Sequence, residues 1–181
     1  MKKSLIITLL LVSASIFGQS DTVSFNEKDM VKEINNLRTN PKSYIRYIEK
    51  FINDEKIVND INNEDVSYAN ILIKALIKTK PMSKVVQCDY MSDITKTHLK
   101  CLNNERKVCK ECASDGKLVD RFKHLKISYI NENIVPNIGA IESIVFLLFT
   151  DSDAIGIILD PDWKFVSIAS DDELIIQDFA Y

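Results

Sequence analysis

The 26 acidic residues of this sequence, Glu132 and Asp151 among them, are its most numerous side chains able to do acid–base chemistry. Two carboxyl groups can share such work when their surroundings separate their pKa values and when both border one concave site. A hydrolase that uses this pair is one hypothesis. The two histidines, His98 and His124, lie far apart in the sequence and neither stands in a catalytic motif. The sequence therefore gives little support for a nucleophile activated by histidine.

Four cysteines, Cys88, Cys101, Cys109 and Cys112, form a second group with reactive side chains. An even, clustered set in an exported protein predicts disulfides. Cys88 and Cys101 fall on one predicted helix, about 20 Å apart along its axis, whereas bonded cysteines have Cα atoms about 4.4–6.8 Å apart. If both bridges form, each of these two must therefore pair with Cys109 or Cys112.

The spacing of Cys109 and Cys112 is also that of a redox pair, but such pairs normally begin a helix that follows a strand. A charged loop precedes this one, so we favour disulfides. A four-cysteine zinc site is a further alternative, disfavoured by export. The acidic residues between positions 151 and 162 lack the spacing of an EF-hand. We expect no metal and no cofactor.

The chain begins with features of a secretory signal peptide. Two lysines precede an apolar run that ends near Gln19, and this run is shorter than the roughly 20 residues of a membrane span. We expect residues 1–19 to be a cleaved signal peptide, residues 20–181 to form one domain, and the protein to be secreted or periplasmic. Loss of Lys2 and Lys3 leaves 21 basic against 26 acidic residues, a net charge near −5. Without a basic cluster, neither nucleic acid nor stable membrane insertion is expected.

Apolar residues at helical spacing predict four helices in the first part of the chain. Their approximate ranges are 24–40, with a capping box at Ser24, then 41–51, 67–79 and 84–102. The second part predicts a strand over 127–135, a buried helix over 141–149, and two strands over 163–169 and 174–181. This order predicts an α+β fold, an α-β-α sandwich with helices packed on a small, mainly antiparallel sheet.

Several short segments of the sequence, taken in order, resemble the CAP domain of pathogenesis-related, antigen-5 and exported bacterial proteins. Their order and spacing carry the resemblance, which covers nearly all of the chain after the signal peptide. These segments are Glu33–Arg38, Asn40-Pro41, Asp115-Gly116, Asp120-Arg121, Asn131-Glu132-Asn133-Ile134, Asp160-Pro161 and Gln177-Asp178-Phe179. The resemblance implies a divergent, exported CAP-like domain over residues 20–181.

The family's cleft contains two acids and two histidines, which in some members bind zinc. The resemblance assigns Glu132 to the first acid, and Asp151 lies near the second. The first histidine would fall at Glu111 or Cys112 and the second at Ala154, so neither position supplies an imidazole. Carboxylates alone suit zinc poorly, since imidazole nitrogens are favoured ligands. The resemblance therefore implies a degenerate cleft.

These observations favour a non-enzymatic binding protein whose site would include Glu132, Asn133, Asp151 and His98. The resemblance implies a lipid or sterol, or else a protein, as its ligand, and an unknown small molecule remains open. Glu132 could instead be a strand residue paired with a nearby lysine. His98 is expected to be a hydrogen-bonded core histidine and His124 to face solvent. A third hypothesis is a disulfide-stabilised structural or adhesive module.

Overall fold

A four-stranded sheet lies at the centre of the described residues, 26–53 and 63–181 of a computed structural model. Its strands lie in the order β1-β3-β4-β2, with the bounds β1 Val86–Gln87, β2 Ile130–Pro136, β3 Phe165–Ser170 and β4 Leu174–Ala180. Strand β4 pairs antiparallel with both β2 and β3, whereas β1 runs parallel to β3. The predicted mainly antiparallel sheet is confirmed.

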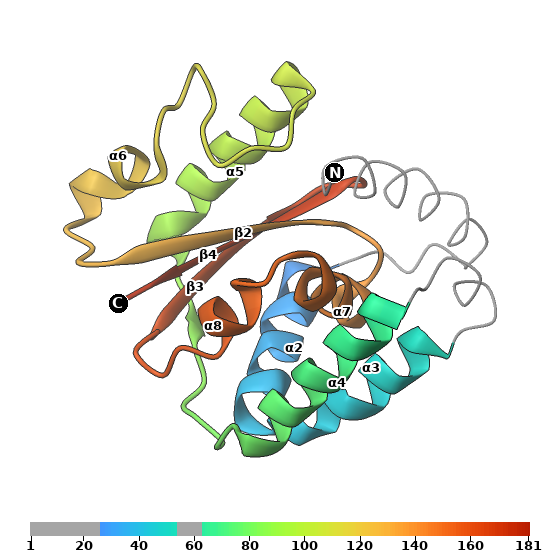
Figure 1. The fold of residues 1–181 in the computed structure, drawn as a ribbon. Helices are drawn as coiled ribbons and strands as arrows, with labels where there is room; N and C mark the ends of the chain where they lie inside the picture. The colour runs from blue at the N-terminus through green and yellow to red at the C-terminus, as the bar shows by residue number, and fades with distance from the viewer. Residues whose placement is uncertain (1–25, 54–62) are drawn as a thin grey trace.

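Helices cover both faces of this sheet, as Figure 1 shows. One face carries α2 Glu27–Thr39, α3 Ile45–Ile52, α4 Asn63–Lys78, α7 Ala140–Thr150 and α8 Ala154–Ile158. The other carries α5 Asp89–Glu105 and α6 Leu118–Phe122. Two short 3-10 turns, η1 Pro41–Tyr44 and η2 Lys123–Leu125, join neighbouring helices or follow them. The predicted α-β-α sandwich is confirmed.

Strand β4 shows why two helical layers are needed. Its side chains alternate between the faces: Ile175 and Phe179 join the large core beneath α2 and α7, and Ile176 and Ala180 join smaller clusters beneath α5 and α6. All four are buried. Because apolar side chains lie on both faces of the strand, exposing either face to water would forfeit the free energy gained by burying those side chains.

Arg38 connects α2 to the segments that follow α8 and precede β1. Its guanidinium is wholly buried and donates hydrogen bonds to the carbonyl oxygens of Ser83 (2.9 Å), Ile158 (2.7 Å) and Asp160 (2.8 Å). A buried cation is tolerated when its donors are satisfied in this way. Arg38 therefore holds three parts of the large helical layer in register.

Some element boundaries differ from the sequence-based prediction. Helix α2 begins at Glu27 with Asn26 as its N-cap, and the proposed capping residue Ser24 lies outside the described residues. Helix α5 begins at Asp89 rather than at position 84, because the residues before it pair with β3 as strand β1. Helices α6 and α8 were not predicted. Both have only five residues, too short to show a helical repeat in the sequence.

The predicted disulfides are absent, and all four cysteines are free. Cys88 is the N-cap of α5 and packs in the cluster that contains Phe122, whereas Cys101, Cys109 and Cys112 gather near the other end of that helix. The length of α5 therefore separates Cys88 from every possible partner. The prediction that Cys88 pairs with Cys109 or Cys112 is wrong for this structure.

Two predictions concern membranes and export. Among the described residues, every helix is too short or too polar to cross a bilayer. The predicted signal peptide, residues 1–19, lies outside the described residues and stays a prediction.

Candidate functional site

A row of polar side chains crosses the sheet on the face that α5 covers. The strand register places Asp178 of β4 opposite both Glu132 of β2 and Ser167 of β3. All three are buried, and Thr95 of α5 packs onto them. The Thr95 hydroxyl donates to Asp178 Oδ2 at 2.7 Å and lies 2.9 Å from Ser167 Oγ. The layer between α5 and the sheet is therefore polar at its centre.

Arg121 of α6 provides the positive charge of this network. Its Nη2 donates to Glu132 Oε2 at 2.6 Å, and Nη1 donates to the carbonyl oxygen of Lys110 at 3.2 Å. The side chain of Arg121 is 3% exposed and that of Glu132 is 0% exposed, so the pair is sealed from water. Removal of one partner from such a pair leaves an uncompensated buried charge.

His98 of α5 lies between two of the acids. Its Nδ1 is 2.7 Å from Asp115 Oδ2, and its Nε2 is 3.7 Å from Glu132 Oε1. The predicted hydrogen-bonded core histidine is confirmed, and His124 faces solvent as expected. The two positions assigned to the family's histidines supply no imidazole, but His98, a predicted member of the same candidate site, lies beside Glu132.

This imidazole does not make a metal cradle with Glu132. Arg121 Nη1 lies 2.9 Å from His98 Nδ1 and 3.3 Å from His98 Nε2, so a guanidinium already occupies the space beside both ring nitrogens. A second cation there would meet strong repulsion in a medium of low dielectric constant. His98, Glu132 and Arg121 therefore form a buried hydrogen-bond network.

Burial perturbs the two opposed carboxyl groups. Burial and then the charge of Asp178 raise the pKa of Glu132 to about 8, against the opposing effects of Arg121 and His98. Burial likewise raises the pKa of Asp178 to about 6. Glu132 Oε1 and Asp178 Oδ1 otherwise have no hydrogen-bond partner. A proton held between them would satisfy both atoms, because a protonated carboxyl becomes a donor.

The other predicted site residues lie in the opposite layer. Asp151 follows α7 as its C-cap and raises the pKa of Tyr68 on α4, although burial contributes more to that shift. Asn133 points away from its neighbour Glu132, and its Nδ2 donates to Gln177 Oε1 at 3.3 Å. The acid–base pair of Glu132 and Asp151 is therefore not assembled, since the sheet separates the two.

Sequence reasoning missed most members of the network, namely Thr95, Asp115, Arg121 and Asp178. Three of them stand in segments quoted for the family resemblance, but no role followed from that. Asp178, a charged residue inside the apolar strand of residues 174–181, could have indicated the network, because a buried charge needs a partner. The partner itself could not be identified from sequence, since α6 is contributed by a separate segment.

The hollow nearest the missing histidine position is lined by aromatic and acidic side chains. It has a volume of about 370 Å³ and is lined by Tyr129, Asn131, Ser152, Asp153, Ile155, Gly156, Ile157, Asp160 and Trp163. Tyr129 stacks on Trp163 with ring centroids 5.6 Å apart, and on Tyr181 at 5.7 Å. Ala154, where the second histidine would fall, is wholly buried behind this surface. We call this the aromatic hollow.

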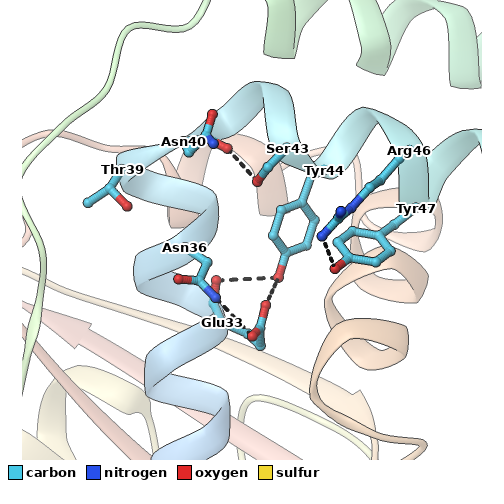
Figure 2. A pocket seen from close by; sticks show the side chains of 8 residues that line it. All are labelled: Glu33, Asn36, Thr39, Asn40, Ser43, Tyr44, Arg46 and Tyr47. Atoms are coloured by element: carbon cyan, nitrogen blue, oxygen red, sulfur yellow. Dashed lines mark hydrogen bonds between the residues drawn. The ribbon is translucent and has the colours of Figure 1, made fainter.

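Two further hollows lie elsewhere on the molecule. One, of about 230 Å³, lies between α2 and η1, where Tyr44 donates to Glu33 Oε2 at 3.0 Å (Figure 2). Its polar groups largely satisfy one another, as the dashed contacts in Figure 2 show. The other, of about 680 Å³, lies between the end of α5 and the turn that joins β3 to β4. Neither borders Glu132 or His98.

The fold itself has relatives among solved structures. An extracellular protein containing an SCP domain, from Bacillus anthracis, aligns with 70% of this chain at 15% identity and a TM-score of 0.51. The alignment covers 43% of that protein, so this chain spans less than half of its length. An outer surface protein from Borrelia burgdorferi aligns with 66% of this chain and 95% of its own, at 14% identity and a TM-score of 0.47.

No protein-family model matches the sequence, and no curated protein sequence matches it. The likeness to the Bacillus anthracis protein nevertheless establishes the fold: the chain has a divergent CAP-like fold, also called SCP-like. The family resemblance inferred from ordered sequence segments is thereby confirmed at the level of the fold.

Proposed function

We propose that this protein is exported and acts without catalysis, by binding a basic segment of a partner protein at the aromatic hollow. The observation that carries the proposal is the contrast between the two candidate regions. Glu132 and His98 are 0% exposed and bound to Arg121, whereas Tyr129 is 53% exposed beside acidic side chains.

The buried network argues against catalysis at Glu132. A general acid or base must come within hydrogen-bond reach of the substrate. Glu132 and Asp178 lie beneath α5, which carries His98, and these three residues line none of the three hollows described above. With Asp151 on the other side of the sheet, the hydrolase hypothesis has no assembled pair. The network instead fixes α5 and α6 against the sheet.

The aromatic hollow has the chemistry to bind a cationic side chain. Tyrosine and tryptophan rings attract lysine or arginine through their negative faces, and carboxylates add direct charge pairing. Tyr129, which is half-exposed and stacks on the buried Trp163, supplies the ring, and Asp153 and Asp160 supply the acids. The net charge near −5 that remains after loss of Lys2 and Lys3 favours approach of a basic partner. A sterol would require a mostly apolar pocket, and polar residues make up much of this lining.

Export rests on two observations. The predicted signal peptide covers residues 1–19, and the fold is shared with an extracellular protein of Bacillus anthracis. Detection of the mature chain outside the cytoplasm, beginning near Ser20 by mass spectrometry, tests it. A chain that keeps its first 19 residues in the cytoplasm would contradict export.

The fluorescence of Trp163 provides a direct binding assay, because it is the sole tryptophan of the chain and lines the hollow. Short synthetic peptides centred on lysine or arginine are expected to change its emission in a saturable way. Tyr129→Ala should weaken that binding at least about tenfold, as expected for an aromatic anchor. Tyr90→Ala is the matched control, because Tyr90 is 85% exposed on α5, in the other helical layer.

The same fluorescence assay distinguishes a protein ligand from a lipid ligand. Vesicles of phosphatidylcholine and cholesterol test the lipid alternative. A response to vesicles with none to peptides would replace the protein partner by a lipid. Peptide binding that Tyr129→Ala and Tyr90→Ala reduce equally would move the site away from the hollow.

A further inference from the structure

Three potential metal ligands meet where α5 ends, outside the His98 network. Cys101 and Glu105 stand four residues apart on α5 and so share one face of the helix. Cys112 joins them from the following loop, which is closed by a β-bridge between Cys112 and Gly116. The two sulfur atoms and a Glu105 oxygen all lie within 4.8 Å of one another. No sequence motif announced this grouping, because the loop brings Cys112 back to the helix.

The surrounding contacts orient these groups toward a common point. Glu105 Oε1 accepts a hydrogen bond from the backbone of Ala113 at 2.8 Å and one from Cys101 Sγ at 3.6 Å. Cys101 Sγ also lies 2.9 Å from Ser114 Oγ. Cys101 and Cys112 are buried, whereas Glu105 is exposed. The thiols are therefore held by packing, and the carboxylate side leaves a way in for an ion.

The donor set is that of a zinc-class ion. Two thiolates and a carboxylate suit zinc, whose bonds to sulfur are about 2.3 Å and to carboxylate oxygen about 2.0–2.2 Å. Tetrahedral ligands at those bond lengths stand roughly 3.5–3.8 Å apart, so movements of about 1 Å bring the three groups into place. Each thiol would release its proton to solvent when its sulfur binds the ion.

A second trio, His98, Cys112 and Asp115, also has ligand atoms within 4.8 Å of one another. Arg121 disfavours a cation there, because its Nη1 lies 2.9 Å from His98 Nδ1 and 3.8 Å from Asp115 Oδ1. Cys112 belongs to both trios, but the other two members of the first trio, Cys101 and Glu105, have no such contact with Arg121. Electrostatics therefore separates the two possibilities.

We propose that Cys101, Glu105 and Cys112 bind one zinc-class divalent ion, with water as the fourth ligand. Cys109 packs against the same cluster as Cys101 and Cys112. The ion ties the loop that carries Cys112 to the last turn of α5. This proposal departs from the expectation of a metal-free protein, and it is independent of the function proposed for the aromatic hollow.

Cobalt is the probe, because tetrahedral thiolate sites give it distinctive visible and charge-transfer absorption. The full chain is purified under reducing conditions, stripped with a chelator and titrated with Co²⁺, and then with Zn²⁺ as competitor. One tetrahedral Co²⁺ per chain, displaced by Zn²⁺, is expected. Saturation with zinc should also raise the melting temperature by about 5–10 °C.

Variants locate the ion. Cys101→Ser and Cys112→Ser should abolish the thiolate bands, and Glu105→Gln should weaken binding about tenfold or more. Glu105 is exposed, so its variant tests the site even if a cysteine variant fails to fold. Cys88→Ser is the matched control, because Cys88 lies in a different cluster and should bind as the wild type does.

Some outcomes would overturn the site. One is failure of the reduced wild-type chain to take up cobalt. Another is octahedral cobalt spectra without thiolate bands. A third is cobalt binding that neither Glu105→Gln nor a folded Cys112→Ser weakens relative to the control Cys88→Ser. Isolation of a Cys101–Cys112 disulfide whose reduction yields no metal uptake would assign these thiols to redox chemistry instead.

Discussion

Replacement of Glu132 by glutamine tests the buried acid network, since glutamine keeps the side-chain size and cannot ionise. In the folded protein, burial and Asp178 raise the pKa of Glu132 to about 8, compared with an ordinary value of 4.5. Between those pH values the folded protein holds a proton that the unfolded chain has lost. In the variant, the glutamine amide can still accept from Arg121 and donate to Asp178.

The sign of the effect follows from proton linkage. A raised carboxyl pKa gives a stabilising contribution that is complete below pH 4.5 and is lost as the pH rises through about 8. Each proton of difference changes the free energy of unfolding by about 1.4 kcal/mol per pH unit. The raised pKa of Asp178 is about 6. Above that pH, the proton held by Glu132 accounts for most of the change in the free energy of unfolding. The wild type should therefore lose about 2 kcal/mol between pH 6 and pH 8.

Urea denaturation followed by circular dichroism at pH 6 and pH 8 measures this difference. Glu132→Gln should lose most of the pH dependence over this window. The control, Glu49→Gln, changes an exposed residue of α3 and should behave as the wild type. His98, Asp115 and Arg121 remain in both proteins, so the comparison isolates Glu132. A wild type whose stability does not fall, or a variant that falls equally, would refute a shared buried proton.

Two other substitutions test the large helical layer. Arg38→Met removes a buried cation that binds three carbonyl oxygens, and it should lower the free energy of unfolding in urea by about 2–4 kcal/mol. The control Arg46→Met, at an exposed position, should change that free energy by less than about 0.5 kcal/mol. Gly139→Ala should cost at least about 1 kcal/mol in thermal unfolding, because φ is +104° and the new Cβ would lie 2.7 Å from Glu142 Oε2. Gly156→Ala in α8 should be neutral or stabilising in the same assay, because nothing in the described part of the chain crowds the new Cβ within 4 Å. A neutral Arg38→Met or Gly139→Ala would show that the contact or the backbone angle is not maintained in solution.

Local sequence pattern was enough for the long elements. Two short apolar segments separated by the turn Ser170-Asp171-Asp172 predicted the two C-terminal strands, and the all-round apolar run of residues 141–149 predicted the buried helix α7. The apolar signal is strong in such segments because each buries most of its side chains. It is weak in α6, α8 and β1, which have five, five and two residues. Their positions depend on contacts with distant parts of the chain.

The sequence by itself determined the α+β class, the CAP-like order of segments, and Glu132 as a residue of special chemistry. Only the tertiary structure decided what that chemistry is. Helix α5 places His98 beside Glu132, and α6 places Arg121 against both, which makes a predicted cleft acid part of a sealed hydrogen-bond network. The same packing separates Asp151 from Glu132 and gathers Cys101 and Cys112. Sequence fixes which groups are present, but their pKa values, partners and access to water depend on which groups meet across the sheet, and that is a property of long-range packing.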